Sequence, residues 1–361
     1  MHITIAINGE GRGHFSRARA LAEILKERHR ITFRAPAHLA GELRNLFPDC
    51  TVREIPYLAF EQNGFTLDIL KTIVKNIPLV LRAPRVQTRL ARELREEGTQ
   101  MVLSDFEPFT SRAAKLVGIP VLQLNHPGVV TRSAWFSPSW LLSAIVSNYM
   151  MGHADKTLIC SFFDGDIGPI VRAELRNKER TDGDYFVVYQ KPLYREFLAP
   201  VLSALGEDRF RIFPDSRANY ADALAGCAGL IAPAGHQSIS EALALGKPVF
   251  VIPVQGQFEQ ELNAFKLKES GCGDWCFFHE LAHRLPSFIH SIKQYQTALQ
   301  AHRDRPASEN TGWLCRDDTA RAADLVERFI LESTLRPEWR RPRLTAPLVT
   351  ALFPEEIPAA G

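Results

Sequence analysis

Residues 227–263 read CAGLIAPAGHQSISEALALGKPVFVIPVQGQFEQELN, and the elements predicted within them set the architecture expected for the whole chain. The apolar run 227–232 predicts a buried strand, and a proline and a glycine then form a turn. A helix is predicted over 238–245, because Ser238 and Glu241 have the spacing of a capping box. A second buried strand and another helix follow the glycine that ends this helix. Such alternation is typical of a parallel α/β sheet.

The turn before Ser238 lies at the carboxyl end of a predicted strand, which is the edge of a parallel sheet where ligands bind. Free backbone N–H groups at a helix N-terminus favour an anion such as phosphate. Glu241 lies one turn into the helix and can accept hydrogen bonds from vicinal hydroxyls, as on a ribose. Glu259 and Gln260 open the next helix at the same edge and can bind a second ring. Phosphate, ribose and sugar together describe a nucleotide sugar. The alternative is that Ser238 and Glu241 only cap the helix.

These residues resemble the donor-binding signature of GT-B glycosyltransferases, closest to the MurG-type enzymes, the UDP-glycosyltransferases and an uncharacterised bacterial and archaeal group. The matching pattern is Gly235-x-x-Ser238-x-x-Glu241-Ala242-x-x-x-Gly246-x-Pro248, then Pro253 and Glu259-Gln260-x-x-Asn263. The resemblance implies an α/β protein with two Rossmann-like domains that face a cleft, and a C-terminal helix that crosses back to the first domain. It also implies an inverting, metal-independent hexosyl- or N-acetylhexosaminyl-transferase that uses a nucleotide sugar, most often a UDP-sugar, and no cofactor beyond this co-substrate.

The donor site implied by the resemblance draws on both halves of the chain. It comprises Arg12, Gly13, Gly235, His236, Gln237, Ser238, Glu241, Glu259, Gln260 and Asn263. Arg12 is expected to stabilise the diphosphate as it leaves, and Asn263 to add to the sugar contacts. The chain departs from the plant-type signature, because the phosphate-binding histidine of that signature aligns with Pro233. Phosphate contact is therefore expected to shift to His236 or to the backbone.

A second glycine-rich turn, Asn8-Gly-Glu-Gly-Arg-Gly-His14, lies between a predicted strand at 3–7 and a predicted helix at 16–28. Its glycine spacing does not fit the dinucleotide fingerprint, and no acidic residue ends the following strand at 31–35, so NAD is not expected. The resemblance places the catalytic base at His14. A neutral imidazole can take a proton from an acceptor hydroxyl, but His14 is also suited to binding phosphate or to structuring the loop.

Carboxylates and a histidine follow two other predicted strands of the first half. Asp105 comes directly after the buried strand 101–104, and the resemblance implies that it orients His14. The alternative is that Asp105 caps the helix that begins nearby, and Glu107 is a second candidate carboxylate. His126 follows the strand 119–124. We expect Glu107 and His126 to face the acceptor.

Residues 66–97 mix apolar and basic side chains at roughly helical spacing. One interpretation is a set of helices that pack on the core and leave a solvated basic face. The other is a contact with an anionic membrane surface or with a lipid-linked or cell-envelope acceptor. Both interpretations stay open.

Composition sets the remaining limits. A chain of 361 residues is long enough for two domains, and a net charge of +2 gives no reason to expect a nucleic-acid partner. The six cysteines are scattered, and neither a signal peptide nor a membrane span is visible. We therefore expect a cytoplasmic protein, with peripheral contact at the inner face of the membrane as an open option.

No metal site is expected. Cys272 and Cys276 form a C-x3-C pair without the second pair that zinc requires. The D-x-D pairs 164–166 and 182–184 lie in a turn-rich stretch, where aspartate is a common turn residue.

The expected boundaries follow from these assignments. They are an acceptor domain at 1–163, a linker at 164–184, a donor-binding domain at 185–316, a crossing helix at 317–335 and a tail at 336–361.

Two other functions stay open. A nucleotide-sugar 2-epimerase shares this fold but needs further acid/base carboxylates in the cleft. A non-catalytic nucleotide-sugar-binding protein would keep the donor signature without needing His14 and Asp105.

Overall fold

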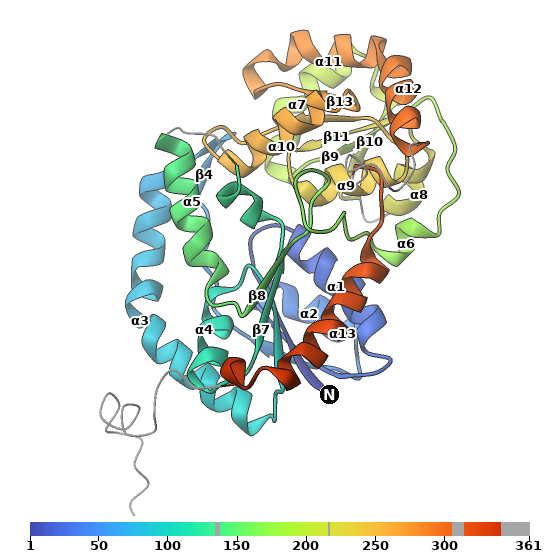
Figure 1. Ribbon diagram of the computed structural model, residues 1–361. Helices are drawn as coiled ribbons and strands as arrows, with labels where there is room; N and C mark the ends of the chain where they lie inside the picture. The colour runs from blue at the N-terminus through green and yellow to red at the C-terminus, as the bar shows by residue number, and fades with distance from the viewer. Residues whose placement is uncertain (134–137, 216, 305–313, 341–361) are drawn as a thin grey trace, which may run out of the picture.

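The computed structural model describes residues 1–133, 138–215, 217–304 and 314–340, which form the two expected Rossmann-like domains (Figure 1). Each domain is built on a parallel β-sheet. The first sheet has the strand order β3-β2-β1-β6-β7-β8, and the second has the order β10-β9-β11-β12-β13. The two-domain α/β architecture predicted from the sequence is therefore confirmed.

The strands are short. Those of the first sheet are β1 (His2–Ile7), β2 (Arg30–Ala35), β3 (Thr51–Glu54), β6 (Met101–Asp105), β7 (Val121–Asn125) and β8 (Lys156–Ile159). Those of the second are β9 (Phe186–Tyr189), β10 (Phe210–Phe213), β11 (Gly229–Pro233), β12 (Val249–Ile252) and β13 (Gly273–Trp275). A separate hairpin consists of β4 (Gln62–Asn63) and β5 (Thr66–Leu67).

Helices connect these strands. Those of the first domain are α1 (Gly13–Leu25), α2 (Ala37–Leu46), α3 (Ile69–Glu96), α4 (Pro108–Leu116) and α5 (Pro138–Met151). The remaining ones are α6 (Ala173–Arg176), α7 (Pro192–Ala204), α8 (Tyr220–Gly226), α9 (His236–Ala244), α10 (Phe258–Glu269), α11 (Leu281–His290), α12 (Ile292–Arg303) and α13 (Thr319–Leu335). Short 3₁₀ turns include η1 (Pro127–Thr131) and η4 (Pro337–Arg340).

The central strands are buried on both faces, as is usual for parallel sheets. All six residues of β1 are buried, and its Ile3 and Ile5 belong to a core cluster shared with α1 and α2. A second cluster joins α3 and α4 to the other face of the same sheet. These two clusters fix the sheet between helical layers, so the loops at its carboxyl edge are held by rigid elements.

Each sheet has a point where the chain changes direction. In the first sheet β1 is followed by β2 on one side, whereas β6 returns to its other side. In the second sheet β9 has β10 on one side and β11 on the other. Ligands of α/β proteins bind at such switch points, beyond the carboxyl ends of the strands. A ligand-binding site is therefore expected at the loops after β1, β6, β9 and β11.

Helix α13 returns from the second domain to the first, which confirms the predicted crossing (Figure 1). Its Ala322, Val326 and Phe329 are buried in the core cluster of the first sheet. The start of α13 is fixed by Asp318, whose Oδ2 accepts a hydrogen bond from the Gly168 backbone N–H at 2.8 Å. The first domain is thus completed by the end of the chain.

The β4–β5 hairpin links the first domain to the second. The Leu67 N–H donates to the Gln255 carbonyl at 2.9 Å, and the Gln255 N–H donates to the Phe65 carbonyl at 2.7 Å. The Phe65 ring stacks on Phe278 with centroids 4.2 Å apart and packs against Tyr194 at 4.4 Å. Through these contacts the hairpin spans the two domains just before α3 begins.

Two predicted helix starts are corrected. Helix α1 begins at Gly13 rather than at residue 16, which places His14 inside its first turn. Helix α9 begins at His236, with Gly235 as an N-cap that makes no side-chain hydrogen bond. The predicted capping box of Ser238 and Glu241 is therefore wrong, because the helix starts two residues earlier.

Between residues 57 and 97 the structure places the hairpin and then one long helix, α3, which continues through Pro78 and Pro84. Most of the predicted tail at 336–361 lies outside the described residues. Within the part of the chain that is described, no helix combines the length and the apolar character needed to cross a bilayer.

Candidate active site

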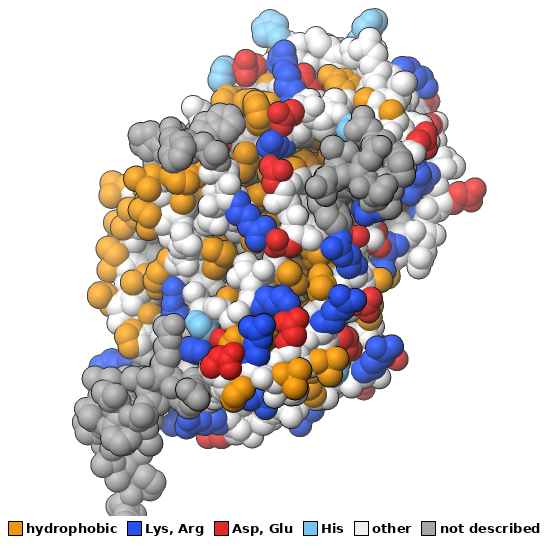
Figure 2. Space-filling model, viewed as in Figure 1, with side chains coloured by type: hydrophobic (Ala, Val, Ile, Leu, Met, Phe, Trp, Pro, Cys, Tyr) orange, Lys and Arg blue, Asp and Glu red, His pale blue; other side chains and the backbone are white. Residues whose placement is uncertain are grey.

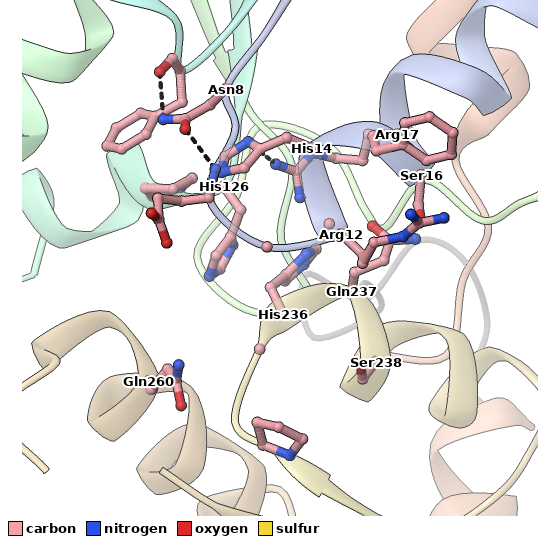
Figure 3. Close-up of a pocket in the computed structure, with 18 of the residues that line it drawn as sticks. Asn8, Arg12, His14, Ser16, Arg17, His126, His236, Gln237, Ser238 and Gln260 are labelled. Carbon is pink, nitrogen blue, oxygen red and sulfur yellow. Dashed lines mark hydrogen bonds between the residues drawn. The ribbon is translucent and has the colours of Figure 1, made fainter. Parts of the chain in front are cut away.

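A cavity of about 390 Å³ lies between the carboxyl edges of the two sheets. The first domain lines it with the loop after β1, the start of α1, Phe106 and His126. The second domain lines it with the starts of α9 and α10, and Arg172 of the connecting segment also borders it. Figure 3 shows side chains from both domains converging on this space. The switch points of the two sheets therefore share one site.

His14 and Asp105 meet because their strands are neighbours. The register pairs Ile7 of β1 with Asp105 of β6, and His14 follows β1 across the glycine-rich loop. His14 Nδ1 lies 2.6 Å from Asp105 Oδ1, and both side chains are buried. This arrangement is that of a histidine oriented by a carboxylate.

Arg17, one turn further along α1, holds the same carboxylate. Its Nε donates to Asp105 Oδ2 at 2.8 Å and its Nη2 to Oδ1 at 2.9 Å. Burial raises the pKa of Asp105, but the charge of Arg17 and the hydrogen bonds from His14 and Arg17 outweigh this effect and hold that pKa below its usual range. Asp105 is therefore ionised at neutral pH.

The tautomer of His14 follows from these contacts. Arg17 Nη2 also lies 2.9 Å from His14 Nδ1, which is longer than the 2.6 Å contact between Nδ1 and Asp105 Oδ1. The shorter contact to ionised Asp105 favours Nδ1–H as the donor. Nε2 then carries the lone pair, and no described residue forms a hydrogen bond with it.

The Phe106 ring stacks on His14. The two rings are parallel within 3°, with centroids 5.8 Å apart. Phe106 has a φ of 60°, a conformation that is strained for an aromatic residue and typical of functional sites. Asn8 stabilises it, because its Nδ2 donates to the Phe106 carbonyl at 2.9 Å (Figure 3).

A histidine pair joins the domains at the floor of the cavity. His126 of the first domain stacks on His236 of the second, with centroids 3.8 Å apart. His126 Nε2 lies 2.9 Å from Asn263 Oδ1, and its Nδ1 lies 3.1 Å from the Cys160 carbonyl. Burial, with the nearby Arg17 charge, lowers the pKa of His126 to about 3. The neutral ring can donate through only one nitrogen, and the shorter contact favours Asn263.

The N-terminus of α9 faces the cavity with unsatisfied polar groups. The Gly235 N-cap makes no side-chain hydrogen bond, so the first backbone N–H groups of the helix are available to a ligand. His236 Nδ1 and Gln237 Oε1 are enclosed and have no hydrogen-bond partner among the described residues. Buried polar atoms are rarely left unpaired, so this edge fits a polar or anionic ligand.

The sequence profile described as Glycosyl transferase family 1 matches residues 1–293. This chain belongs to glycosyl transferase family 1. Two relatives named as uncharacterised glycosyltransferases, from Methanosarcina mazei and Methanosarcina acetivorans, are each 26% identical over 76% of this chain and 85% of their own.

Solved structures share the fold of this glycosyltransferase. LpCGTa in complex with UDP has a TM-score of 0.60 at 17% identity, covering 91% of this chain and 99% of its own. MurG of Acinetobacter baumannii has a TM-score of 0.57 at 16% identity, with the same coverage. VinC in complex with dTDP has a TM-score of 0.56 at 14% identity, covering 92% of this chain and all of its own. At these identities the likeness concerns the fold, which is GT-B.

Glu241 of the glycosyltransferase lies on the cavity wall with both carboxylate oxygens occupied. Arg172 Nε and Nη2 each donate to it at 2.8 Å, and Gln237 Nε2 donates at 2.9 Å. Its contact with ribose stays a prediction. The pairing with Arg172 is long-range in sequence and could not be anticipated from the motif.

The other predicted donor residues fall into two groups. Gly13, Ser238, Glu259 and Gln260 line the cavity, as does Arg12, which is exposed and pairs with Glu42 at 2.7 Å. Asn263 does not line it. It is fully buried, and its Nδ2 donates to the Ala234 carbonyl at 3.0 Å while its Oδ1 meets His126. The predicted sugar contact of Asn263 is therefore replaced by a role between the domains.

Glu107 also differs from its predicted role. Its two oxygens accept from the Phe109 N–H at 2.9 Å and the Thr110 N–H at 2.7 Å, which makes it the N-cap of α4. It is buried and is not part of the cavity lining, so it does not face an acceptor there. Glu107 thus performs the capping that was the alternative for Asp105. His126 does line the cavity, and its contact with an acceptor stays a prediction.

The acidic and thiol pairs considered as metal sites have other partners. Asp166 binds Arg132, and Asp182 binds Lys247 at 3.1 Å. Cys272 and Cys276 are buried and form no disulfide with a described cysteine, and the Cys272 thiol donates to the Ser270 carbonyl at 3.6 Å. Across the described ranges, no group of three His, Cys, Asp or Glu residues is arranged to hold a metal ion.

Arg17 and Phe106 were missed by the sequence analysis. Arg17 carried a usable signal, because it lies three residues after His14 and therefore on the same face of the helix. Phe106 carried none, since its position depends on the strained backbone after β6.

Replacing Glu259 with glutamine is expected to change the pH dependence of stability. Burial raises the pKa of Glu259 from 4.5 to about 7. A raised carboxyl pKa means that stability is fully present at low pH and is lost as pH rises between these values. The Gln variant lacks this loss, so above about pH 7 it should exceed wild type in unfolding free energy by about 1–3 kcal/mol.

Urea unfolding across this pH range measures the effect. Glu269→Gln is the matched control, because Glu269 is exposed at the end of the same helix. Parallel pH profiles for the Glu259 variant and wild type would contradict the raised pKa.

Proposed function

We propose that this glycosyltransferase transfers a sugar from a nucleotide-sugar donor to an acceptor hydroxyl with inversion at the anomeric carbon, and that His14 is the catalytic base. The observation that supports it most is the 2.6 Å contact between His14 Nδ1 and Asp105 at the edge of the interdomain cavity. It fixes the ring and leaves Nε2 as the proton acceptor. The helix N-terminus of α9 lies across the same cavity.

The reaction balances with these groups. His14 Nε2 removes the proton of the acceptor hydroxyl as the acceptor oxygen attacks the anomeric carbon. The new carbon–oxygen bond forms on the face opposite the leaving group, while the bond from the anomeric carbon to the phosphate oxygen breaks. The nucleoside diphosphate takes the electron pair. Asp105 stabilises the imidazolium that results.

The N-terminus of α9 stabilises the leaving group in this proposal. Its free N–H groups and the positive end of the helix dipole favour the negative charge that develops on the diphosphate. Ser238 lies in the first turn and lines the cavity, so its hydroxyl adds a donor. We propose that these groups act without a metal ion, which leaves transfer insensitive to chelators.

The donor in this proposal is a UDP-sugar or a related pyrimidine nucleotide sugar. Support comes from two solved proteins of the same fold, LpCGTa in complex with UDP and VinC in complex with dTDP. Tyr189, Lys191 and Tyr220 border the cavity near α9 and are suited to contacting a base or a diphosphate.

A nucleotide screen by thermal unfolding tests the donor site. The expected result is a higher midpoint with one nucleoside diphosphate, because a ligand at 100 times its Kd stabilises the native state by about 2.7 kcal/mol. The shift should be the same with and without EDTA. The matching nucleoside without phosphate is the control, and an equal shift with it would argue against the α9 anion site. No shift with UDP, TDP, GDP or ADP, or with their sugar derivatives, would overturn the donor assignment.

A further inference from the structure

Helix α3 and helix α5 carry most of the exposed large apolar side chains of the described chain. Of sixteen such side chains, seven lie on α3 and three on α5. Figure 2 shows apolar side chains gathered on the side of the first domain where Figure 1 places these helices. We call this region the α3–α5 surface and define it by Leu70, Val74, Ile77, Leu81, Leu141 and Ile145.

The apolar residues of α3 form a stripe. Leu70, Val74, Ile77 and Leu81 recur at intervals of four, three and four, so they lie on one face of the helix. Leu70 is 72% exposed and Leu81 is 76% exposed. The buried residues of α3 begin only at Ala83. The first half of the helix is therefore apolar without being covered by the core.

Helix α5 continues this surface. Its sequence from Pro138 to Met151 contains no charged residue, and Leu141 and Ile145 are 54% and 59% exposed. The partly buried residues Leu79 of α3 and Val146 of α5 pack against one core cluster, so the two helices flank the same part of the domain. Exposed apolar side chains that gather on one side of a domain indicate an interaction site.

Basic residues recur along α3 beside the apolar stripe. Between Ile69 and Arg92, α3 carries six Lys or Arg residues and no Asp or Glu. Lys71 and Lys75 pair with acidic residues, whereas Arg82 and Arg85 are exposed and form no ion pair with any described residue. Since the whole chain has a net charge of only +2, these cations are concentrated locally.

We propose that the α3–α5 surface docks on an anionic lipid bilayer, with its apolar side chains in the interface and Arg82 and Arg85 against lipid phosphates. Apolar residues beside Lys and Arg on one helix are typical of interfacial binding. A second copy of the chain is disfavoured as the occupant, because its own basic α3 would meet this one. The basic residues of the surface thus favour an anionic partner, and the apolar stripe favours a partner made of lipid.

The docked position would also affect which acceptors are reached. Helix α3 begins directly after the β4–β5 hairpin, and Phe60 and Gln62 of this segment line the cavity. The apolar stripe therefore begins at Leu70, eight residues after Gln62 of the cavity lining. This consequence rests on the proposed function, and it favours an acceptor anchored in the bilayer.

Vesicle co-sedimentation of the full chain tests the proposal. Wild type should bind vesicles that contain phosphatidylglycerol much better than vesicles of phosphatidylcholine alone, and added salt should weaken the binding. The double variant Leu70→Ser/Leu81→Ser should bind at least about tenfold more weakly, because two apolar contacts with the interface are lost. Arg82→Glu/Arg85→Glu should lose the preference for anionic vesicles.

The control is Leu331→Ser/Leu335→Ser on α13, which removes two leucines of similar exposure (66% and 81%) from another helix. It should bind vesicles as wild type does. An unchanged nucleotide-induced thermal shift in the α3 variants would show that the fold and the donor site are intact, which separates this proposal from the proposed catalysis.

Two results would overturn the docking proposal. One is wild-type protein that stays in solution with phosphatidylglycerol vesicles. The other is a wild-type dimer in light scattering that the Leu70→Ser/Leu81→Ser variant dissociates, which would assign the surface to a second copy.

Discussion

Replacing His14 with alanine is expected to lower the rate of sugar transfer by about 10²–10⁴-fold, the usual contribution of a positioned general base. The variant removes the only group proposed to take the acceptor proton, while Ser238 and the α9 N-terminus are untouched. Nucleotide binding should therefore be almost unchanged. The variant should therefore have a lower kcat and an unchanged affinity for the donor.

The measurement is nucleoside diphosphate release at saturating donor and acceptor, together with the nucleotide-induced thermal shift. His283→Ala is the control, because His283 is an exposed histidine on α11, away from the cavity. Full transfer activity in the His14 variant would refute the base assignment. Loss of nucleotide binding with normal stability would instead place His14 in phosphate contact.

Replacing Arg17 with methionine is expected to lower the free energy of unfolding near neutral pH by about 3–5 kcal/mol. Arg17 and Asp105 are both buried, and Arg17 donates to both carboxylate oxygens. Without the guanidinium, Asp105 remains as a buried charge with only His14 beside it. Methionine keeps most of the apolar contacts of the arginine stem, so the loss comes mainly from the charge.

The pH dependence of this loss has a definite sign. In wild type the lowered pKa of Asp105 contributes stability that is present above its unfolded pKa and is lost as pH falls through its folded pKa. In the Arg17 variant burial dominates, so the Asp105 pKa rises and the carboxyl is favoured in its protonated form. The destabilisation should therefore be large at about pH 7 and much smaller at about pH 4.

Urea unfolding at these two pH values provides the measurement. Arg19→Met is the matched control on the same helix, because its ion pairs with Glu23 and Glu174 are partly exposed and should contribute less than about 1 kcal/mol. The double variant Arg17→Met/Asp105→Asn should recover part of the loss. An equal loss at both pH values would mean that Arg17 acts through packing alone.

The fold could be predicted because its signals are local. A strand, a glycine turn and a helix can be recognised within twenty residues, and the alternation of such units implies a parallel sheet. The pairing of His14 with Asp105 was implied by the resemblance to GT-B glycosyltransferases, and the pairing of β1 with β6 places the two side chains in contact. Their distance supports this placement, while their catalytic roles stay predictions.

The remaining site contacts depend on how distant elements pack. Asn263 was assigned to the sugar from its place in a motif, but the domain interface buries it between Ala234 and His126. Glu241 was assigned to ribose, but Arg172 lies 69 residues away in sequence and reaches it only in the folded chain. Helix starts were misplaced by two or three residues, because Gly235 caps α9 without any side-chain signal.

The return of α13 to the first domain has a consequence for the order of folding during synthesis. The first sheet and its helices leave the ribosome long before residues 319–335, yet Val326 and Phe329 belong to their core. Until those residues emerge, the apolar side chains that they cover next to α1 stay exposed in the nascent first domain. The first domain is therefore completed only after the second domain has been synthesised. A chain that stops before residue 319 would expose apolar surface that chaperones and proteases recognise.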